Sequence, residues 1–203
     1  MRGRFNNSSE PDKFLGTSRI IRTIKKQIKV AASYDYPILI TGETGVGKTL
    51  LAHIIHSASR RRGKPFLHQS CSNIPSELLE SELFGHEKGA FTGATESKKG
   101  KIEIADGGTL FLDEIADLSL QNQAKLVQFL ENAKFFRVGG TRELHADARI
   151  ISASNRDLAE EINNKRFRGD LYHRINTLEI YVPPLRKRKE DISILINEIG
   201  LSA

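Results

Sequence analysis

Residues 37–57 of the chain read PILITGETGVGKTLLAHIIHS. A short β-rich run leads into a glycine-rich turn, and a stretch with apolar residues at helical spacing follows. In such a turn the glycines let backbone N–H groups point inward around phosphate oxygens, and the helix directs the positive end of its dipole at the same anion. This order predicts a phosphate-binding loop. The alternative, a glycine turn beside an incidental lysine, does not account for the strand and the helix on either side.

Each part of this loop has a chemical role. Lys48 supplies a point charge to the outer phosphates, and the Thr49 hydroxyl is a ligand that Mg²⁺ accepts. We therefore predict that the phosphates are bound by the whole loop, which comprises Gly42, Glu43, Thr44, Gly45, Val46, Gly47, Lys48 and Thr49.

A second apolar run, residues 109–112, ends in two carboxylates, Asp113 and Glu114. Open α/β sheets bind ligands at the carboxyl ends of their strands. We expect Asp113 to hold the magnesium ion, directly or through water, and Glu114 to polarise the attacking water. If this run stood alone, a strand end exposed to solvent would be the better interpretation. Because a phosphate loop precedes it in the chain, we favour the catalytic interpretation.

Further segments predict how the domain is built. Residues 65–68, 149–152 and 178–182 are strand candidates, and helical spacing is found in residues 20–32, 121–132 and 190–199. Short strands that alternate with helices predict an α/β fold with a central parallel sheet flanked by helices. We expect a flexible tail over residues 1–13, an α/β nucleotide-binding subdomain over residues 14–184, and the beginning of a helical subdomain over residues 185–203.

Composition excludes several classes of protein. The chain has 203 residues, 38% of them hydrophobic, and a net charge of +6, which suits a folded domain and is a weak indication of nucleic-acid binding. The lone Cys71 permits neither an internal disulfide nor a four-ligand zinc site. The sequence contains no apolar run of the roughly 20 residues that span a bilayer, and its N-terminus lacks the apolar core of a signal peptide. We therefore expect a reduced, cytoplasmic setting and no membrane partner.

Residues 80–94 read ESELFGHEKGAFTGA. This segment closely resembles the signature loop of bacterial enhancer-binding proteins, the AAA+ ATPases that activate RNA polymerase carrying the sigma-54 factor. The resemblance extends from about residue 15 to the end of the chain, through residues 105–115, 137–140, 149–158, 167–174 and 183–186. It implies a P-loop AAA+ α/β subdomain with ATP and Mg²⁺ as cofactors. It also implies ATP hydrolysis that remodels the sigma-54 polymerase for open complex formation.

In that family the hexapeptide loop projects from the ATPase ring and engages sigma-54. Here it comprises Gly89, Ala90, Phe91, Thr92, Gly93 and Ala94. Small residues around one aromatic make a mobile arm, and an exposed Phe loses about 2 kcal/mol of burial unless a partner covers it. The alternative is a surface loop whose Phe folds back onto the domain. Residues 137–140 resemble the family's second loop, which works with the first, although an ordinary turn would also fit.

Three further residues match the family's functional positions. Asn155 matches a sensor that orients the water or contacts the terminal phosphate, whereas an Asn after a strand is otherwise usually a turn or helix cap. Arg168 and Arg174 match arginine fingers, which reach the ATP of the neighbouring subunit. This implies a homo-oligomer, in the family a hexameric ring. The alternative for these arginines is a solvated basic face.

The sequence also departs from the family. Thr49 occupies a position where the family often has Glu. Ser70 occupies a position where the family usually has an Asn, whose amide restrains the catalytic glutamate. The restraint of Glu114 is therefore in doubt unless Gln69 substitutes for that Asn. We expect the helical lid to be largely absent, and we assign no specific DNA binding to this chain because no helix-turn-helix segment is recognised in it. One alternative function is a nucleotide-binding module that binds sigma-54 or oligomerises without turnover. Another is a different AAA+ machine, but that class lacks the hexapeptide loop.

Overall fold

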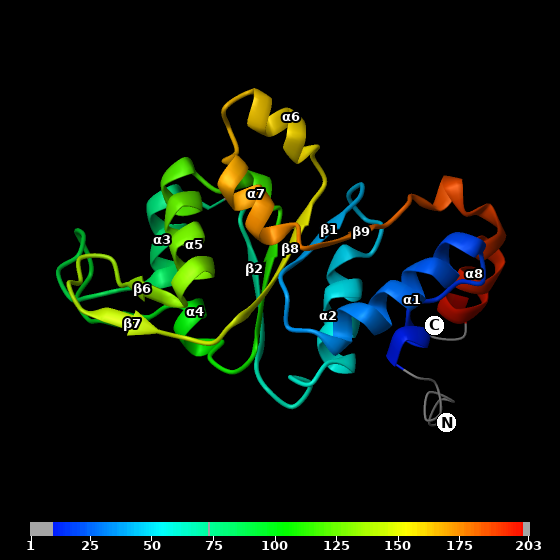
Figure 1. Cartoon of the computed structure of the whole chain (residues 1–203), viewed down its shortest axis with the longest axis horizontal. Helices are drawn as coiled ribbons and strands as arrows, with labels where there is room; N and C mark the ends of the chain where they lie inside the picture. Colours follow the sequence, from blue (N-terminus) through cyan, green and yellow to red (C-terminus); the bar gives the residue numbers. More distant parts are fainter. Residues whose placement is uncertain (1–9, 73, 201–203) are drawn as a thin grey trace.

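Five parallel strands form the central sheet of the computed structural model, which describes residues 10–72 and 74–200, with side chains to residue 198. The strands lie in the order β2 (Phe66–Ser70), β5 (Thr109–Asp113), β8 (Arg149–Ser154), β1 (Ile38–Thr41) and β9 (Leu178–Tyr181) (Figure 1). Every neighbouring pair is parallel. The predicted α/β fold and all five predicted strands of this sheet are confirmed.

Helices cover both faces of the sheet (Figure 1). In β5, Leu110 and Leu112 belong to one hydrophobic cluster and Phe111 to the other, because successive side chains of a strand point to opposite faces. The Phe111 cluster lies under α1 (Arg19–Ser33) and α2 (Lys48–Ala58). The other lies under α3 (Ser76–Phe84), α4 (Lys101–Ile104), α5 (Leu120–Asn132), α6 (Leu158–Asn163) and α7 (Gly169–Ile175).

Helical periodicity located the longer helices. The predicted helices at residues 20–32 and 121–132 are confirmed as α1 and α5, and the predicted stretch after the glycine loop is α2. In α1 the side chains of Ile21, Ile24 and Ile28 are buried as their spacing predicts. Helices α3, α4, α6 and α7 were not predicted, because helices of four to nine residues contain too few turns to establish a period.

Two small antiparallel hairpins project from one end of the domain, at the left of Figure 1, and neither was predicted. One pairs β3 (Gly85–His86) with β4 (Lys98–Lys99), and the other pairs β6 (Lys134–Phe136) with β7 (Glu143–His145). Backbone hydrogen bonds join them, since Val138 N donates to Gly85 O at 2.9 Å and Glu87 N donates to Val138 O at 3.0 Å. The two hairpins therefore form one unit.

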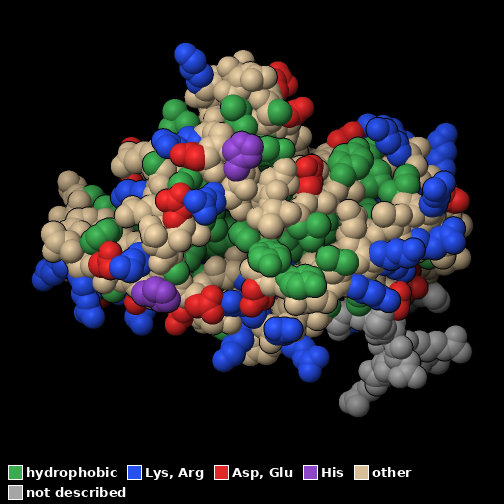
Figure 2. All heavy atoms as spheres, in the orientation of Figure 1, with side chains coloured by type: hydrophobic (Ala, Val, Ile, Leu, Met, Phe, Trp, Pro, Cys, Tyr) green, Lys and Arg blue, Asp and Glu red, His purple; other side chains and the backbone are tan. Residues whose placement is uncertain are grey.

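Positive charge is not spread evenly over the molecule. Helix α1 carries Arg19, Arg22, Lys25, Lys26 and Lys29 and no Asp or Glu. Figure 2 shows Lys and Arg side chains gathered over the part of the molecule that contains this helix. Among the described residues, no helix is both long enough and apolar enough to cross a membrane.

The two ends of the described chain pack against α1. Residues 1–9 of the predicted tail lie outside the described residues, but the remainder differs from a free tail, because η1 (Glu10–Lys13) packs on α1 and α2 and is followed by the buried Phe14. At the other end, η3 (Leu185–Lys187) and η4 (Lys189–Asp191) precede α8 (Ile192–Gly200), which begins two residues after the predicted helix start.

Asp191 fastens this C-terminal segment to the start of α1. It is fully buried, and its Oδ1 accepts hydrogen bonds from Thr17 N at 2.7 Å and Ser18 N at 2.8 Å. Burial opposes the charged carboxylate, but the hydrogen bonds from Ser18 and Thr17 and the charge of Arg188 outweigh it and hold the pKa of Asp191 below its ordinary value.

Replacing Asp191 with Ala should therefore lower the free energy of unfolding at pH 7 by about 1–3 kcal/mol, because two buried N–H groups lose their acceptor. A carboxyl whose pKa is lowered by folding stabilises the protein above its unfolded pKa, about 3.9, and that contribution is lost as the pH falls through the folded pKa. The difference from wild type should thus shrink between pH 7 and pH 3 in urea denaturation, whereas the exposed Glu190→Ala should behave as wild type. An equal loss at both pH values would contradict the assignment.

Candidate functional site

The glycine-rich loop curves between the end of β1 and the start of α2. Gly42, Gly45 and Gly47 all have positive φ angles, of 149°, 82° and 101°. A Cβ atom on Gly42 would lie 2.4 Å from the carbonyl oxygen of Val182, so no larger residue fits there. The glycine positions that the sequence analysis used are thus required by backbone geometry, and the loop is free to turn N–H groups inward.

Lys48, the first residue of α2, lies inside this curve and is only 8% exposed. Its Nζ donates to Gly42 O at 2.8 Å and to Glu43 O at 2.9 Å. Burial lowers the pKa of Lys48, and the negative charges of Asp113 and Glu114 only partly offset that effect. The loop therefore concentrates an ammonium group and backbone dipoles where an anion would bind.

Thr49 and Asp113 are brought together across two elements. Thr49 Oγ1 lies 3.3 Å from Asp113 Oδ2, and His68 Nε2 lies 3.8 Å from the same oxygen. A hydroxyl and a carboxylate are oxygen donors of the kind that Mg²⁺ prefers. Within residues 10–72 and 74–200 no group of three or more His, Cys, Asp or Glu could hold a metal. The donors present fit a magnesium ion that takes its remaining ligands from phosphate and water.

Glu114 follows β5 in a left-handed backbone conformation, with φ 54° and ψ 48°. For a residue other than glycine this conformation is costly, so it is found where the surrounding structure enforces it. The Glu114 N–H donates to Asp113 Oδ1 at 3.0 Å, which helps to hold the turn. The sequence placed Glu114 at the strand end, but only the structure shows that its backbone is strained.

The side chains of Ser70 and Gln69 form hydrogen bonds with groups other than the Glu114 carboxylate. Ser70 is in register with Asp113, but its hydroxyl bonds to the hydroxyl of Ser72 at 3.0 Å, and Gln69 Nε2 donates to Ser70 O at 2.5 Å. In the part of the chain that the structure describes, neither side chain forms a hydrogen bond with the Glu114 carboxylate.

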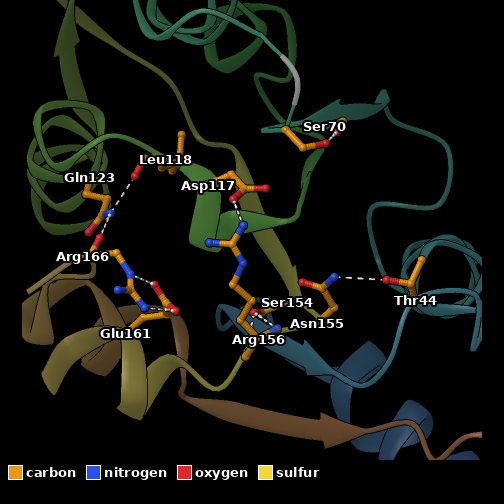
Figure 3. A network of polar contacts seen from close by, with 11 residues as sticks. Thr44, Ser70, Asp117, Leu118, Gln123, Ser154, Asn155, Arg156, Glu161 and Arg166 are labelled. Atoms are coloured by element: carbon orange, nitrogen blue, oxygen red, sulfur yellow. Dashed lines mark hydrogen bonds and ion pairs between the residues drawn. The ribbon is translucent and has the colours of Figure 1, made fainter. Parts of the chain in front are cut away.

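Asn155 joins the end of β8 to the phosphate loop. Its Nδ2 donates to Thr44 Oγ1 at 3.1 Å, as Figure 3 shows. The next residue, Arg156, forms an ion pair at 2.5 Å with Asp117 of η2 (Ile115–Asp117), which lies directly beyond Glu114. Asn155 could be selected from the sequence, but the pair formed by Arg156 and Asp117 could not, because the two residues are remote in the chain.

The segment that follows β9 closes the other side of the loop. Arg186 Nη1 donates to Glu43 Oε2 at 2.7 Å and lowers the pKa of that carboxyl, while Arg188 Nη2 donates to Val46 O at 3.4 Å. The Glu43 carboxylate thus faces Arg186, and it is the Glu43 carbonyl that contacts Lys48. Between the two segments lies a cavity of about 490 Å³, lined by Glu43, Thr44, Gly45, Val46, Pro184, Leu185, Arg186, Arg188 and Leu195.

Arg168 and Arg174 lie at the two ends of α7, away from these contacts. Arg168 pairs with Asp170 at 2.7 Å and Arg174 pairs with Glu131 of α5 at 2.8 Å. Their side chains are 42% and 51% exposed. Among the described contacts none joins either guanidinium to the chain's own phosphate loop, so the structure does not bring these two predicted site residues into that loop.

The hexapeptide from Gly89 to Ala94 forms the tip of the β3–β4 hairpin. Gly89 N donates to Ala94 O at 2.8 Å and Ala94 N donates to Phe91 O at 3.0 Å, which closes the loop on itself. Phe91 packs edge-on against His86, with ring centroids 5.0 Å apart, and yet remains 44% exposed. The ring thus packs against its own hairpin while the residue stays exposed to solvent.

The loop at residues 137–140 lies directly beside the hexapeptide. Arg137 pairs with Glu87 at 3.1 Å and with Glu103 at 2.8 Å. A Cβ atom on Gly139 would lie 2.8 Å from the Cβ of Ala90, so the close approach of the two loops depends on that glycine. The structure therefore places the two predicted loops in direct contact.

The family model described as the Sigma-54 interaction domain matches residues 14–181 of the chain. Among curated proteins, the chain is 50% identical over 188 residues to the regulatory protein LuxO of Vibrio cholerae, an alignment that covers 93% of this chain and 36% of LuxO. Among solved structures, NtrX from Brucella abortus in complex with ADP is similar, with a TM-score of 0.85 and 38% identity over 91% of this chain and 40% of NtrX.

A second solved structure shares the fold alone. It is the P-loop NTPase domain of a sigma-54 transport activator from E. coli, which is 20% identical with a TM-score of 0.56, over 84% of this chain and 99% of that domain. The chain spans only about a third of the length of the curated relatives that it matches, 36% of LuxO and 35% of NorR2 from Cupriavidus necator.

Proposed function

Because this chain belongs to the sigma-54 interaction domain family of P-loop AAA+ proteins, we propose that it hydrolyses ATP and uses the energy to remodel RNA polymerase carrying sigma-54 into the open complex. One observation carries the proposal. The Lys48 ammonium and Thr49 hydroxyl of α2, the Asp113 carboxylate at the end of β5 and the Asn155 amide after β8 lie at one edge of the sheet, in the same domain as the exposed Phe91. Crystals of the relative NtrX with ADP and with ATP support the choice of nucleotide.

The proposed roles follow from the contacts of each residue. Lys48 would bind the outer phosphates, and Thr49 and Asp113 would hold Mg²⁺, which supplies charge neutralisation at the phosphate oxygens when bound. Glu114 would accept a proton from the attacking water. Asn155, already hydrogen-bonded to Thr44 of the loop, would orient that water or contact the terminal phosphate.

Arg168 and Arg174 would act on the ATP of a neighbouring copy of the chain. Their exposure and their distance from the chain's own loop contacts support this role, because an exposed guanidinium can exchange its carboxylate partner for a phosphoryl group. The proposal therefore requires a homo-oligomer, and we infer a hexameric ring in the cytoplasm, where the polymerase acts.

A titration of activity tests the reaction and separates it from the alternative of a nucleotide-binding module without turnover. The rate of ATP hydrolysis per mole of chain should rise steeply with protein concentration, because neighbours complete each site. A rate that stays at zero at every concentration while ATP still binds would favour the module.

The Phe91 loop is the proposed contact with sigma-54. Replacing the exposed Thr92 with Ala should abolish retention of purified sigma-54 in a pull-down with ATP, while ATP hydrolysis stays within about twofold of wild type. The same change at Thr95, which is exposed just outside the hexapeptide, serves as the control and should leave both activities intact. Retained sigma-54 binding by Thr92→Ala would defeat the assignment of this loop.

A further inference from the structure

Gln123 is a fully buried amide on the first turn of α5. Its Nε2 donates to Leu118 O at 2.7 Å and to Arg166 O at 3.0 Å (Figure 3). Its Oε1 accepts from Arg168 N at 2.8 Å. Both amide hydrogens and the carbonyl oxygen are thus engaged, all with backbone groups of two separate segments. The side chain lies on the buried stripe of α5, three residues before Leu126.

The two segments carry different parts of the proposed reaction. Leu118 follows η2, the short helix directly after Glu114. Arg168 is the N-cap residue of α7 and carries a guanidinium proposed to serve the neighbouring subunit. Because Arg168 N donates to Gln123 Oε1, this side chain holds the start of α7 in position relative to the turn at Glu114.

A series of contacts between residues leads from the phosphate loop to the Gln123 amide. Thr44 bonds to Asn155, the adjacent Arg156 pairs with Asp117, and Asp117 adjoins Leu118 (Figure 3). Spatial continuity of this kind does not by itself establish energetic coupling, which has to be measured.

We propose that Gln123 is a positioning residue that holds Arg168 where the neighbouring subunit's site can use it, and ties that position to the segment behind Glu114. The inference rests on the proposed function, because Arg168 has this role only within an assembly. A misplacement of about 1 Å in a catalytic group can cost about a hundredfold in rate. The loss of the two hydrogen bonds to the backbone on either side of Phe167, together with the one to Leu118 O, is a direct route to such a misplacement.

Mixed assemblies test the proposal. A receiver subunit carries Arg168→Ala, so that its own site is intact but it offers no Arg168 guanidinium. A donor subunit carries Lys48→Ala, so that it offers an arginine but binds no nucleotide. The donor is prepared with and without Gln123→Met, which keeps the volume of the side chain and removes the amide.

The Gln123→Met donor should lower turnover by the receiver about tenfold or more, with the KM for ATP unchanged, because the receiver's own nucleotide contacts are untouched. The matched control is Asn122→Leu in the donor. Asn122 is also a fully buried amide of α5, but its side chain donates to Ser76 O of α3, and among the described residues no hydrogen bond joins it to the Arg168 segment. That donor should support turnover within about twofold of the unmodified one.

If Gln123 had a purely structural role, Gln123→Met and Asn122→Leu would lower turnover by the receiver to the same extent. Thermal melts of each donor measure the loss of stability separately from the loss of turnover. Equal turnover with the Gln123→Met and the unmodified donor overturns the proposal, as does an equal loss with Asn122→Leu. If Gln123→Met does not fold, Gln123→Glu replaces it, since it keeps the acceptor for Arg168 N and loses both donors. Full turnover with that variant overturns the proposed tie between Arg168 and the segment behind Glu114. A mixture of receiver and unmodified donor that shows no turnover contradicts the proposed function itself.

Discussion

Replacing Lys48 with Ala should abolish nucleotide binding by this chain, with an affinity for ATP at least about a hundredfold weaker than that of wild type. The ammonium is buried inside the curve of the loop and is held there by the carbonyl oxygens of Gly42 and Glu43. A charge-assisted hydrogen bond contributes about 1.5–3 kcal/mol, and a loss of 1.4 kcal/mol is tenfold in affinity. Because the ammonium would form at least two such bonds to the outer phosphates, its loss should cost about 3 kcal/mol or more. Titration of a fluorescent ATP analogue measures the effect.

The exposed Lys64 supplies the matched control, because Lys64→Ala removes the same charge in the turn between α2 and β2. That variant should bind ATP as wild type does. ATP binding by Lys48→Ala within about threefold of wild type, with the fold intact by circular dichroism, would remove the phosphate loop from the proposed site.

Replacing Arg168 with Ala should spare nucleotide binding and reduce turnover about a thousandfold or more. An arginine finger is worth about 10³–10⁵ in rate, because its planar, permanently charged guanidinium stabilises the charge that spreads over the transferring phosphoryl group. The side chain is exposed and, among the described residues, pairs only with Asp170, so its removal should leave the fold unchanged. Steady-state phosphate release at saturating ATP, with binding measured in parallel, is the assay.

Lys165→Ala is the control for this substitution. Lys165 is exposed, lies three residues before Arg168, and has no described contact with the nucleotide loop. It should retain turnover within about twofold. Measurable turnover by Arg168→Ala at more than a tenth of the wild-type rate would rule out the assignment of Arg168 as a finger.

Much of the fold could be predicted because its signals are local. The five strands of the central sheet were found from short β-rich runs, since parallel strands covered on both faces are apolar along their length. The order of those strands was not predicted, and no pattern within a strand specifies which neighbour it pairs with. The two hairpins were missed because their strands are too short to show a period, with two residues each in β3 and β4 and three each in β6 and β7.

The phosphate loop lies entirely within one local stretch, and the sequence by itself determined it. The glycines, the lysine and the threonine are adjacent in the chain, so their geometry follows from the turn between β1 and α2. The strand-end position of Asp113 and Glu114 and the match of Asn155 to a sensor were also available from the sequence, together with the hexapeptide around Phe91.

Only the tertiary structure decided which remote residues meet. The ion pair between Arg156 and Asp117, the contacts of Arg186 and Arg188 with the loop, and the clamp formed by Gln123 all join segments far apart in the chain. Such contacts depend on how helices and strands pack around the sheet. A hydrogen bond or an ion pair between distant segments leaves no periodic signal in the sequence, because its energy depends on distances that exist only after the chain has folded.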